Sequence, residues 1–321
     1  MSFLKWGIFM KDLICLGEML IDFLPGNEDG VYIRMPGGAP ANVAVAAAKN
    51  GLNVGFCGRL GDDDFGRFLF HTLEQHHIQP LCPEFVKDAV TTMAFVTLDP
   101  HGDRSFTFAR KPGADMFLTC ADTDQAKTDQ ATILHAGSFS LSKKPASDAT
   151  GYALKKAHTA GKLVSFDINY RSVAWDDDRE GCIRAVKDIL PFVDFLKISE
   201  EEADMLGMSP EDAAREYNIS VLVETLGSDG ARYTYQGQTV HVPGRRVPCV
   251  DTTGAGDAFW GGFLSCLLRS RVTSSADLSE PLVRRAVHYG NVAGSLCVQK
   301  KGAMESLPTT EEIEAIIRSE T

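Results

Sequence analysis

The chain has 321 residues, of which 44% are hydrophobic and 23% are charged, a composition typical of globular proteins. Its formal net charge of −11 argues against a nucleic acid or an anionic membrane surface as partner, because both are bound by basic surfaces. The chain contains no apolar run of about 18 residues, so we predict no transmembrane helix. An enzyme that acts on small molecules is the class that remains.

The eight cysteines are scattered, and none forms a C-x-x-C pair of the kind that binds zinc or exchanges disulfides. Several lie in apolar runs, where a free thiol packs as a small hydrophobic group. We therefore expect a reducing compartment, the cytoplasm. Residues 1–10 lack the length and cleavage site of a signal peptide, and we interpret them as a disordered leader.

Along the chain, short apolar runs alternate with segments of helical periodicity. Buried strands are predicted at residues 13–16, 54–57, 132–135, 163–168, 192–198 and 221–225. Helices are predicted at residues 41–50, 65–78, 146–160, 179–190, 200–217, 255–269, 280–297 and 310–318. This alternation predicts an α/β fold in which helices cover both faces of a mostly parallel sheet.

Two β-rich stretches without a helix between their strands break this alternation. One joins residues 19–25 to residues 31–35, and the other joins residues 91–98 to residues 104–109 through the turn sequence D-P-H-G-D. We expect a small sheet that forms a lid, although edge hairpins without a functional role are the alternative. The predicted lid comprises residues 19–35 and 91–109, and the predicted main domain comprises residues 11–18, 36–90 and 110–321.

The sequence D-T-T-G-A-G-D-A-F at residues 251–259 follows the β-type run Val247–Val250 and precedes an apolar helical segment. It therefore predicts a strand-to-helix turn. The first amides of a helix have no partner within the helix and can bind an anion, and residues 254–256 would supply them here. Such a site is expected at the carboxyl ends of the strands of an open parallel sheet.

Asp257 would lie beside the bound anion, where a carboxylate is unfavourable unless it has a chemical task. The natural task is to take a proton from a hydroxyl group that attacks a phosphoryl group. The alternative is a glycine-rich turn with a helix-capping aspartate. Two other phosphate loops are excluded, because G-x-x-x-x-G-K-[ST] is absent and Phe259 stands where G-x-G-x-x-G needs its third glycine.

Three further stretches carry polar residues at positions that suit a ligand. Gly37, Gly38 and Asn42 belong to G-G-A-P-A-N, which precedes the first long helix, and Asp22 interrupts an apolar run. F-D-I-N-Y-R at residues 166–171 ends a predicted strand, where polar side chains can meet a ligand. Each has an ordinary alternative: helix punctuation, a solvated carboxylate and a surface loop.

The string at residues 251–259 resembles the second signature of the ribokinase-like sugar kinases, the phosphofructokinase B family. The pattern D-x-N-x-R at residues 167–171, followed by Trp175, resembles the fructokinase branch and the related aminoimidazole riboside kinases. The resemblance extends over residues 11–308. It implies a ribokinase-like three-layer α/β/α domain with a β lid. It also implies ATP-dependent phosphorylation of a primary hydroxyl of a small sugar, with fructose giving fructose 6-phosphate as the first choice.

The resemblance also implies roles for individual residues. Asp257 would be the catalytic base, the amides of Gly254, Ala255 and Gly256 would form the anion hole, and Arg171 would lie near the transferred phosphate. The sugar would be bound by Asp22, Gly37, Gly38, Asn42, Phe106, Arg110, Asn169, Arg171 and Asp257. The nucleotide would be bound by Ser199, Glu202, Thr225, Gly227, Gly230, Gly254, Gly256 and Asn291.

Ions are implied as well. Mg²⁺ would accompany ATP, with Glu202 acting on it indirectly. The family has asparagine where this chain has Ser199, so the match there is incomplete. A monovalent cation, K⁺, would be held by oxygen atoms of Asp251, Thr253, Cys297, Lys300, Gly302 and Ser306. Relatives often dimerise through the lid, and we expect a homodimer that binds no nucleic acid or membrane.

Three other functions share this pattern. A 2-keto-3-deoxygluconate kinase or an aminoimidazole riboside kinase would differ in the lid and the substrate loops. A sugar sensor without catalytic activity would keep the fold, but it would have no need of the base at Asp257.

Overall fold

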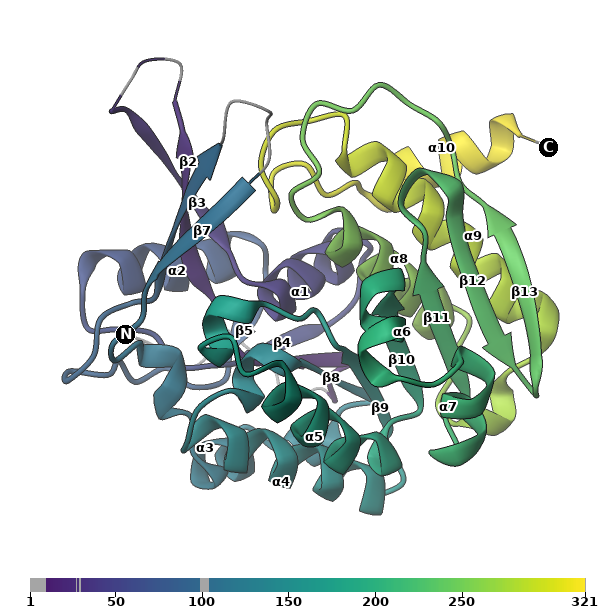
Figure 1. The fold of residues 1–321 in the computed structure, drawn as a ribbon, viewed down its shortest axis with the longest axis horizontal. Coiled ribbons are helices and arrows are strands. Elements are labelled where there is room, and N and C mark those ends of the chain that lie inside the picture. The colour runs from purple at the N-terminus through teal and green to yellow at the C-terminus, as the bar shows by residue number, and fades with distance from the viewer. Residues whose placement is uncertain (1–9, 27, 29, 99–103, 321) are drawn as a thin grey trace.

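The computed structural model describes residues 10–26, 28, 30–98 and 104–320. Within these residues the strands form one nine-stranded sheet and one four-stranded sheet (Figure 1). The large sheet has the order β13-β12-β11-β10-β9-β8-β1-β4-β5. Its strands are β1 (Leu13–Leu16), β4 (Val54–Cys57), β5 (Gln79–Pro80), β8 (Ile133–Gly137), β9 (Leu163–Asp167), β10 (Phe195–Ser199), β11 (Val221–Thr225), β12 (Gly230–Tyr235) and β13 (Gln238–Pro243).

The large sheet is parallel from β5 to β11, and an antiparallel hairpin, β12–β13, extends one edge. The interior strand β1 is buried on both sides, as expected for a parallel sheet covered by helices. Leu13 and Cys15 face one hydrophobic core, and Ile14 and Leu16 face the other. The α/β fold with a mostly parallel sheet is therefore confirmed.

Helices cover both faces of this sheet (Figure 1). One core includes residues of α1 (Ala39–Lys49), α2 (Asp64–Gln75), α8 (Ala255–Arg269), α9 (Glu280–Cys297) and α10 (Thr310–Ser319). The other includes residues of α3 (Cys120–Gln125), α4 (Ala146–Thr159), α5 (Arg179–Ile189), α6 (Glu200–Leu206) and α7 (Pro210–Glu216). Trp260 of α8 is fully buried and stacks on Phe263 at 4.6 Å between ring centroids, which anchors this helix in its core.

The four-stranded sheet stands apart from the large one and consists of β2 (Leu20–Pro25), β3 (Tyr32–Gly37), β6 (Met93–Leu98) and β7 (Arg104–Ala109). Strand β2 runs parallel to β6, and the two outer pairs are antiparallel. Phe23 stacks on Phe95 of β6 at 4.8 Å and meets Phe65 of α2 edge-on at 5.7 Å. These ring contacts fix the base of the small sheet against the main domain.

Most predicted elements are present, but three differ. The helix predicted at residues 200–217 is two helices, because Gly207 ends α6 with φ 68° and Pro210 begins α7. The hairpin β12–β13 was not predicted. Val247–Val250 is not a strand: it is a loop, in which the Val250 amide donates to the Val298 carbonyl. The leader at residues 1–10 lies outside the described residues except for Met10, and the hairpin turn at residues 99–103 lies entirely outside them.

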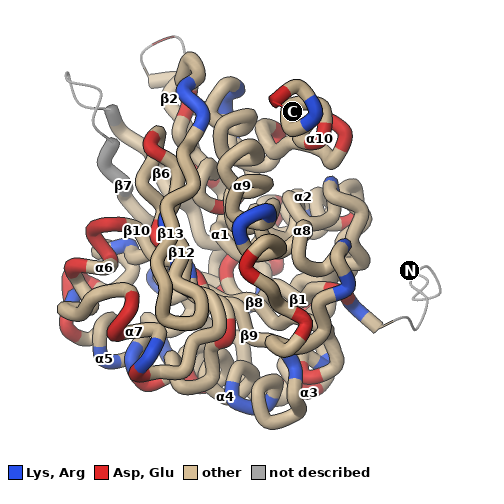
Figure 2. Tube along the Cα trace, turned by 90° about the vertical axis from the view of Figure 1, so that its right-hand side faces the viewer, with Lys and Arg blue, Asp and Glu red and all other residues tan. Residues whose placement is uncertain are grey.

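Acidic and basic residues are interspersed along the outer helices α5 and α7, whereas the charged residues of α6 are all acidic (Figure 2). Within the described part of the chain, no helix is both long and apolar enough to cross a membrane.

Candidate active site

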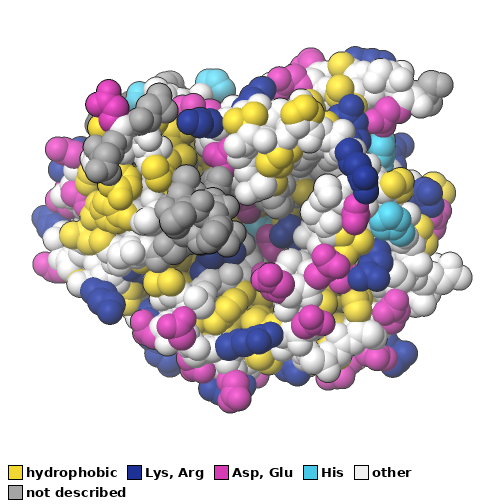
Figure 3. Space-filling model, turned by 45° about the horizontal axis from the view of Figure 1, so that its top comes forward, with side chains coloured by type: hydrophobic (Ala, Val, Ile, Leu, Met, Phe, Trp, Pro, Cys, Tyr) yellow, Lys and Arg dark blue, Asp and Glu magenta, His cyan; other side chains and the backbone are white. Residues whose placement is uncertain are grey.

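A cavity of about 720 Å³ lies at the carboxyl ends of β1, β8, β9 and β10. Strand β2 of the small sheet and the first turns of α1 and α8 complete its wall. The space-filling view shows this side of the molecule hollowed, with charged side chains in the hollow (Figure 3). Nine of the predicted site residues line it: Asp22, Gly38, Asn42, Asn169, Arg171, Thr253, Gly254, Gly256 and Asp257.

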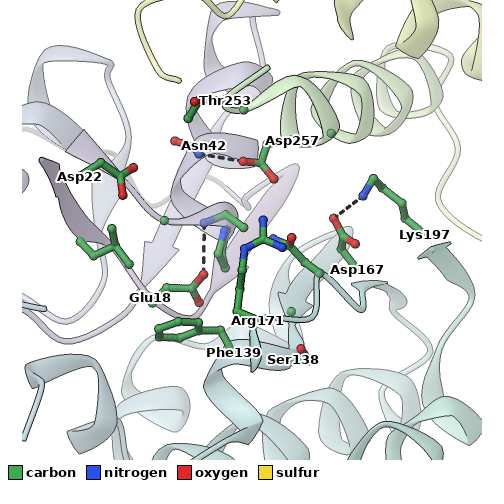
Figure 4. A pocket seen from close by; sticks show the side chains of 18 of the residues that line it. Glu18, Asp22, Asn42, Ser138, Phe139, Asp167, Arg171, Lys197, Thr253 and Asp257 are labelled. Carbon is green, nitrogen blue, oxygen red and sulfur yellow. Dashed lines mark hydrogen bonds and ion pairs between the residues drawn. The ribbon is translucent and has the colours of Figure 1, made fainter. Parts of the chain in front are cut away.

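Asp257 lies in the first turn of α8 and faces the cavity (Figure 4). Its Oδ2 accepts a hydrogen bond of 2.7 Å from Asn42 Nδ2, which joins α8 to α1 across 215 residues of sequence. Withdrawal from water raises the pKa of Asp257, and the negative charge of Asp167 adds to this, while Asn42, Lys197 and Arg171 oppose it. A carboxylate with a raised pKa is a better proton acceptor than an ordinary aspartate.

Of the three amides predicted to form the anion hole, one is already bonded within the protein. Gly254 is the N-cap with φ 78°, a left-handed conformation that favours glycine, and no side chain caps the helix. The Ala255 amide already donates to the Thr252 carbonyl at 3.2 Å, so it is engaged within the protein. The described residues supply no acceptor for the amides of Gly254 and Gly256, which leaves these two for a ligand.

A buried ion pair that the sequence analysis missed lies beside these amides. Lys197 Nζ of β10 bonds to Asp167 Oδ2 of β9 at 2.8 Å, and a side chain on Gly256 would come within 3.4 Å of that nitrogen. Burial opposes the charge of Lys197, but Asp167 and Glu202 hold its pKa above the usual value. The cation therefore persists at the mouth of α8. Its sequence signal was a lysine inside an apolar strand.

The lid side of the cavity carries two carboxyl groups, Asp22 and Glu18. Burial raises the pKa of Asp22 to about 7, helped by the negative charge of Asp257 and opposed by Arg171. Gly37 does not line the cavity, but a side chain there would lie 2.1 Å from Asp22 Oδ2. Gly38 has φ 105° and lies against the backbone of Glu18, so both glycines are required by the packing of the protein itself.

The predicted residues of the substrate loops differ in where they lie. Asn169 and Arg171 line the cavity, and Arg171 is exposed, with its guanidinium bonded to the Tyr170 carbonyl. Arg110 is buried and does not line the cavity, because its guanidinium is bound to Asp115 and to Ser142. Phe106 lies on β7, but its side chain lies outside the described residues.

The residues predicted to bind the nucleotide lie outside the cavity wall, apart from Gly254 and Gly256, and most have structural partners. Ser199 and Glu202 form a capping box at the start of α6, and Glu202 also accepts the Tyr170 amide. The side-chain nitrogen of Asn291, Nδ2, donates to the carbonyls of Val242 and Pro243 at the end of β13. Thr225 is the last residue of β11. Gly227, with φ 57°, lies in the turn that follows it, and Gly230, with φ 100°, is the first residue of β12.

The predicted cation ligands bring two loops together. Asp251 accepts hydrogen bonds from the amide and hydroxyl of Thr253 and from the Gly302 amide. The Cys297 thiol lies 3.0 Å from the Ser306 hydroxyl and 3.7 Å from the Thr253 carbonyl. The Lys300 amide donates to the Cys297 carbonyl, so this loop is closed on itself. Among the described residues no cluster of three or more His, Cys, Asp or Glu side chains could hold a metal ion.

The α/β fold and a cavity at the carboxyl ends of its parallel strands are typical of an enzyme that acts on small molecules, and comparison with known proteins identifies its family. The family model for pfkB family carbohydrate kinases matches residues 6–310, so the chain belongs to that family. It is therefore a phosphotransferase that acts on a sugar.

Individual relatives are fructokinases by name. The chain is 39% identical to "Fructokinase-2" of Zea mays over 322 residues, covering 95% of this chain and 93% of the relative. A crystal structure of fructokinase with bound ATP from Xylella fastidiosa has a TM-score of 0.86 at 30% identity, covering 97% and 99% of the two chains. A Vibrio cholerae O395 fructokinase structure with fructose, ADP and potassium ion bound has a TM-score of 0.85 at 35% identity, covering 95% and 98%.

Proposed function

We propose that this chain transfers the γ-phosphoryl group of ATP to a primary hydroxyl group of fructose, giving fructose 6-phosphate. The observation that carries this proposal is the shared cavity, in which Asp257, the free amides of Gly254 and Gly256, and the lid carboxyl group of Asp22 face one space. The relatives named fructokinase support fructose as the substrate.

In the proposed mechanism, Asp257 takes the proton of the acceptor hydroxyl as its oxygen attacks the γ-phosphorus of ATP. Asn42 orients the base by donating to Oδ2, which leaves Oδ1 to receive the proton. The amides of Gly254 and Gly256 stabilise the charge on the equatorial oxygens of the transferred group. Lys197 adds a fixed positive charge beside these amides, and Arg171 supplies a second charge from the opposite loop.

Two ions complete the proposal. Mg²⁺ neutralises charge on the β- and γ-phosphates, and it would arrive on the nucleotide, because both carboxylate oxygens of Glu202 already accept backbone amides. K⁺ would be held between residues 251–253 and 297–306, where carboxylate and carbonyl oxygens suit a hard cation. This site adjoins the start of α8, so the ion would stabilise the loop that positions the amides.

The charges in the cavity favour a neutral sugar over a sugar acid. Glu18 and Asp22 are the carboxyl groups on the lid side. Arg110, which directly follows the lid strand β7, is bound to Asp115 and does not line the cavity. Five carboxyl groups line the cavity, against two cations: Lys197, which is paired with Asp167, and Arg171. A carboxylate substrate such as 2-keto-3-deoxygluconate would therefore meet an excess of acidic groups over cations. We also propose a reducing, cytoplasmic setting, since all eight cysteines are free.

The direct test is a substrate panel of fructose, 2-keto-3-deoxygluconate, ribose and aminoimidazole riboside, assayed with ATP by ADP release, with and without potassium. We expect fructose to give the highest kcat/KM. Asp257→Asn should lower kcat for fructose by about 10²–10⁴ while leaving fructose binding within a few fold, because only the proton acceptor is lost.

Asp188→Asn on the outer face of α5 is the matched control and should keep wild-type activity, since Asp188 is exposed and distant from the cavity. Near-wild-type turnover by Asp257→Asn would exclude this residue as the base. A better rate with another sugar would replace fructose in the proposal and leave the base untouched.

A further inference from the structure

Glu18 is a cavity residue that the mechanism above does not use. It lies where the chain leaves β1 for the small sheet, and only 4% of its surface is exposed. Its Oε1 accepts the Ala39 amide at the start of α1 at 3.1 Å. Its Oε2 is buried and has no hydrogen-bond partner within the described residues, although the side chain lines the cavity.

A buried carboxyl oxygen without a partner is rare, because such a group loses its bonds to water and gains none in exchange. A sugar in the cavity offers several hydroxyl groups that could supply the missing bond. Figure 4 shows Glu18 beside Phe139, on a different side of the cavity from Asp257. A sugar whose reacting hydroxyl meets Asp257 would therefore present a different hydroxyl group to Glu18.

We propose that Glu18 is a sugar-binding residue whose Oε2 forms a hydrogen bond with a hydroxyl group other than the one that is phosphorylated. The inference rests on the proposed function, since it assigns one more contact to the same substrate.

The protonation state of Glu18 sets the direction of that hydrogen bond. Burial raises the pKa of Glu18 to about 8, and the negative charge of Asp115 adds to this, while the backbone amides of Glu18 itself and of Ala39 and the charge of Arg110 oppose it. Asp115 belongs to a short 3-10 helix (Ala114–Phe117), and Arg110 follows β7. At neutral pH Glu18 is therefore a neutral acid that donates its proton to a sugar oxygen, and it loses this donor as the pH rises through about 8.

The test compares fructose dissociation constants by calorimetry, without ATP, for the wild-type protein, Glu18→Gln and Glu18→Leu. Gln keeps an oxygen for the Ala39 amide and an N–H donor for the sugar, so we expect affinity within a few fold of wild type and no weakening between pH 7.5 and 9. Leu removes the donor, and we expect about ten- to a hundredfold weaker binding at pH 7. Glu200→Gln, at an exposed position outside the cavity, is the control and should match wild type.

A set of fructose analogues that each lack one hydroxyl group separates a direct contact from a structural role. One analogue should bind wild-type protein weakly and lose no further affinity in Glu18→Leu, because the same hydrogen bond is already absent. Equal additional losses for every analogue would overturn the proposal, as would a Glu18→Gln protein that still weakens above pH 8. If Glu18→Leu does not fold, the pH series of Glu18→Gln decides alone. Absence of any fructose phosphorylation by wild-type protein would instead refute the proposed function.

Discussion

Asp22 and Asp257 are two carboxyl groups that share one cavity and influence each other's ionisation. Burial raises the pKa of both carboxyl groups, and the negative charge of Asp257 raises the pKa of Asp22 further. Arg171, which lines the same cavity, opposes the shift in both residues. Such an arrangement is consistent with the two proposed roles, proton transfer for Asp257 and sugar binding for Asp22.

Fructose binding should become tighter as the pH rises through the pKa of Asp22, about 7. The reason is that ionised Asp22 accepts charge-assisted hydrogen bonds from sugar hydroxyls, which are stronger than the bonds of the neutral acid. We expect the dissociation constant to fall about fivefold between pH 5.5 and 7.5. Asp22→Asn should abolish this change, as calorimetry without ATP can establish. If the asparagine variant keeps the full pH dependence, another group, such as Asp257, is responsible.

Sequence analysis predicted candidate site residues that belong to contiguous motifs and missed cavity residues whose position depends on strand register. Asp257 was predicted as the base because it follows the turn amides in one string, D-T-T-G-A-G-D-A-F, and the structure places it in the cavity wall. Lys197 and Asp167 are 30 residues apart, and only the parallel pairing of β9 with β10 places them side by side. Glu18 is an ordinary polar residue in the sequence, and only its burial beside α1 distinguishes it.

At the scale of elements, the start of α8 combines a backbone requirement with the binding role proposed for its amides. Gly254 takes a left-handed conformation, and its Cα faces Ala303 of the loop that follows α9. This contact joins the turn to the same loop that Asp251 holds through the Gly302 amide. The geometry of the amides therefore depends on two loops that are close in space and about 50 residues apart in sequence.

Gly254→Ala should lower the free energy of unfolding by about 1–3 kcal/mol, because alanine is strained at φ 78° and its Cβ would lie 3.0 Å from Ala303. Gly151→Ala in α4 is the matched control. It adds the same methyl group with nothing within 4 Å, and it should raise stability by up to about 1 kcal/mol through helix propensity. Urea unfolding measures both. Equal effects of the two substitutions would show that the conformation of Gly254 carries no special cost.

Helices and strands could be predicted where apolar residues recur with a clear period. Strands at the edge of a sheet were harder to predict. Helices α8 and α9 match their predicted bounds, since long apolar periods fix them. The hairpin β12–β13 was missed because its outer strand is largely exposed and lacks a continuous apolar run. The run Val247–Val250 has β-type residues but pairs with no strand in the part of the chain that the structure describes, so it is a loop.

At the scale of the whole molecule, the small sheet presents an edge that no other described strand pairs with, and an apolar surface. Strand β3 is an outer strand, and Val31, Tyr32 and Ile33 at its start are each 44–46% exposed. Hydrophobic side chains gather on the side of the molecule where the small sheet lies (Figures 1 and 3). Exposed edges and apolar patches are typical sites of association between chains. This surface supports the predicted homodimer through the lid.

We therefore expect wild-type protein to sediment as a dimer at micromolar concentration, and Ile33→Asp to weaken the dimer at least about tenfold, because a charge buried without a partner opposes association. Tyr152→Gln removes a similarly exposed side chain from α4 on the main domain and should leave the dimer intact. Sedimentation equilibrium over a range of concentrations gives the dissociation constants. A wild-type monomer at all concentrations would refute the dimer. A dimer unaffected by Ile33→Asp would place the interface on another surface and leave the lid free to move over the cavity in each subunit.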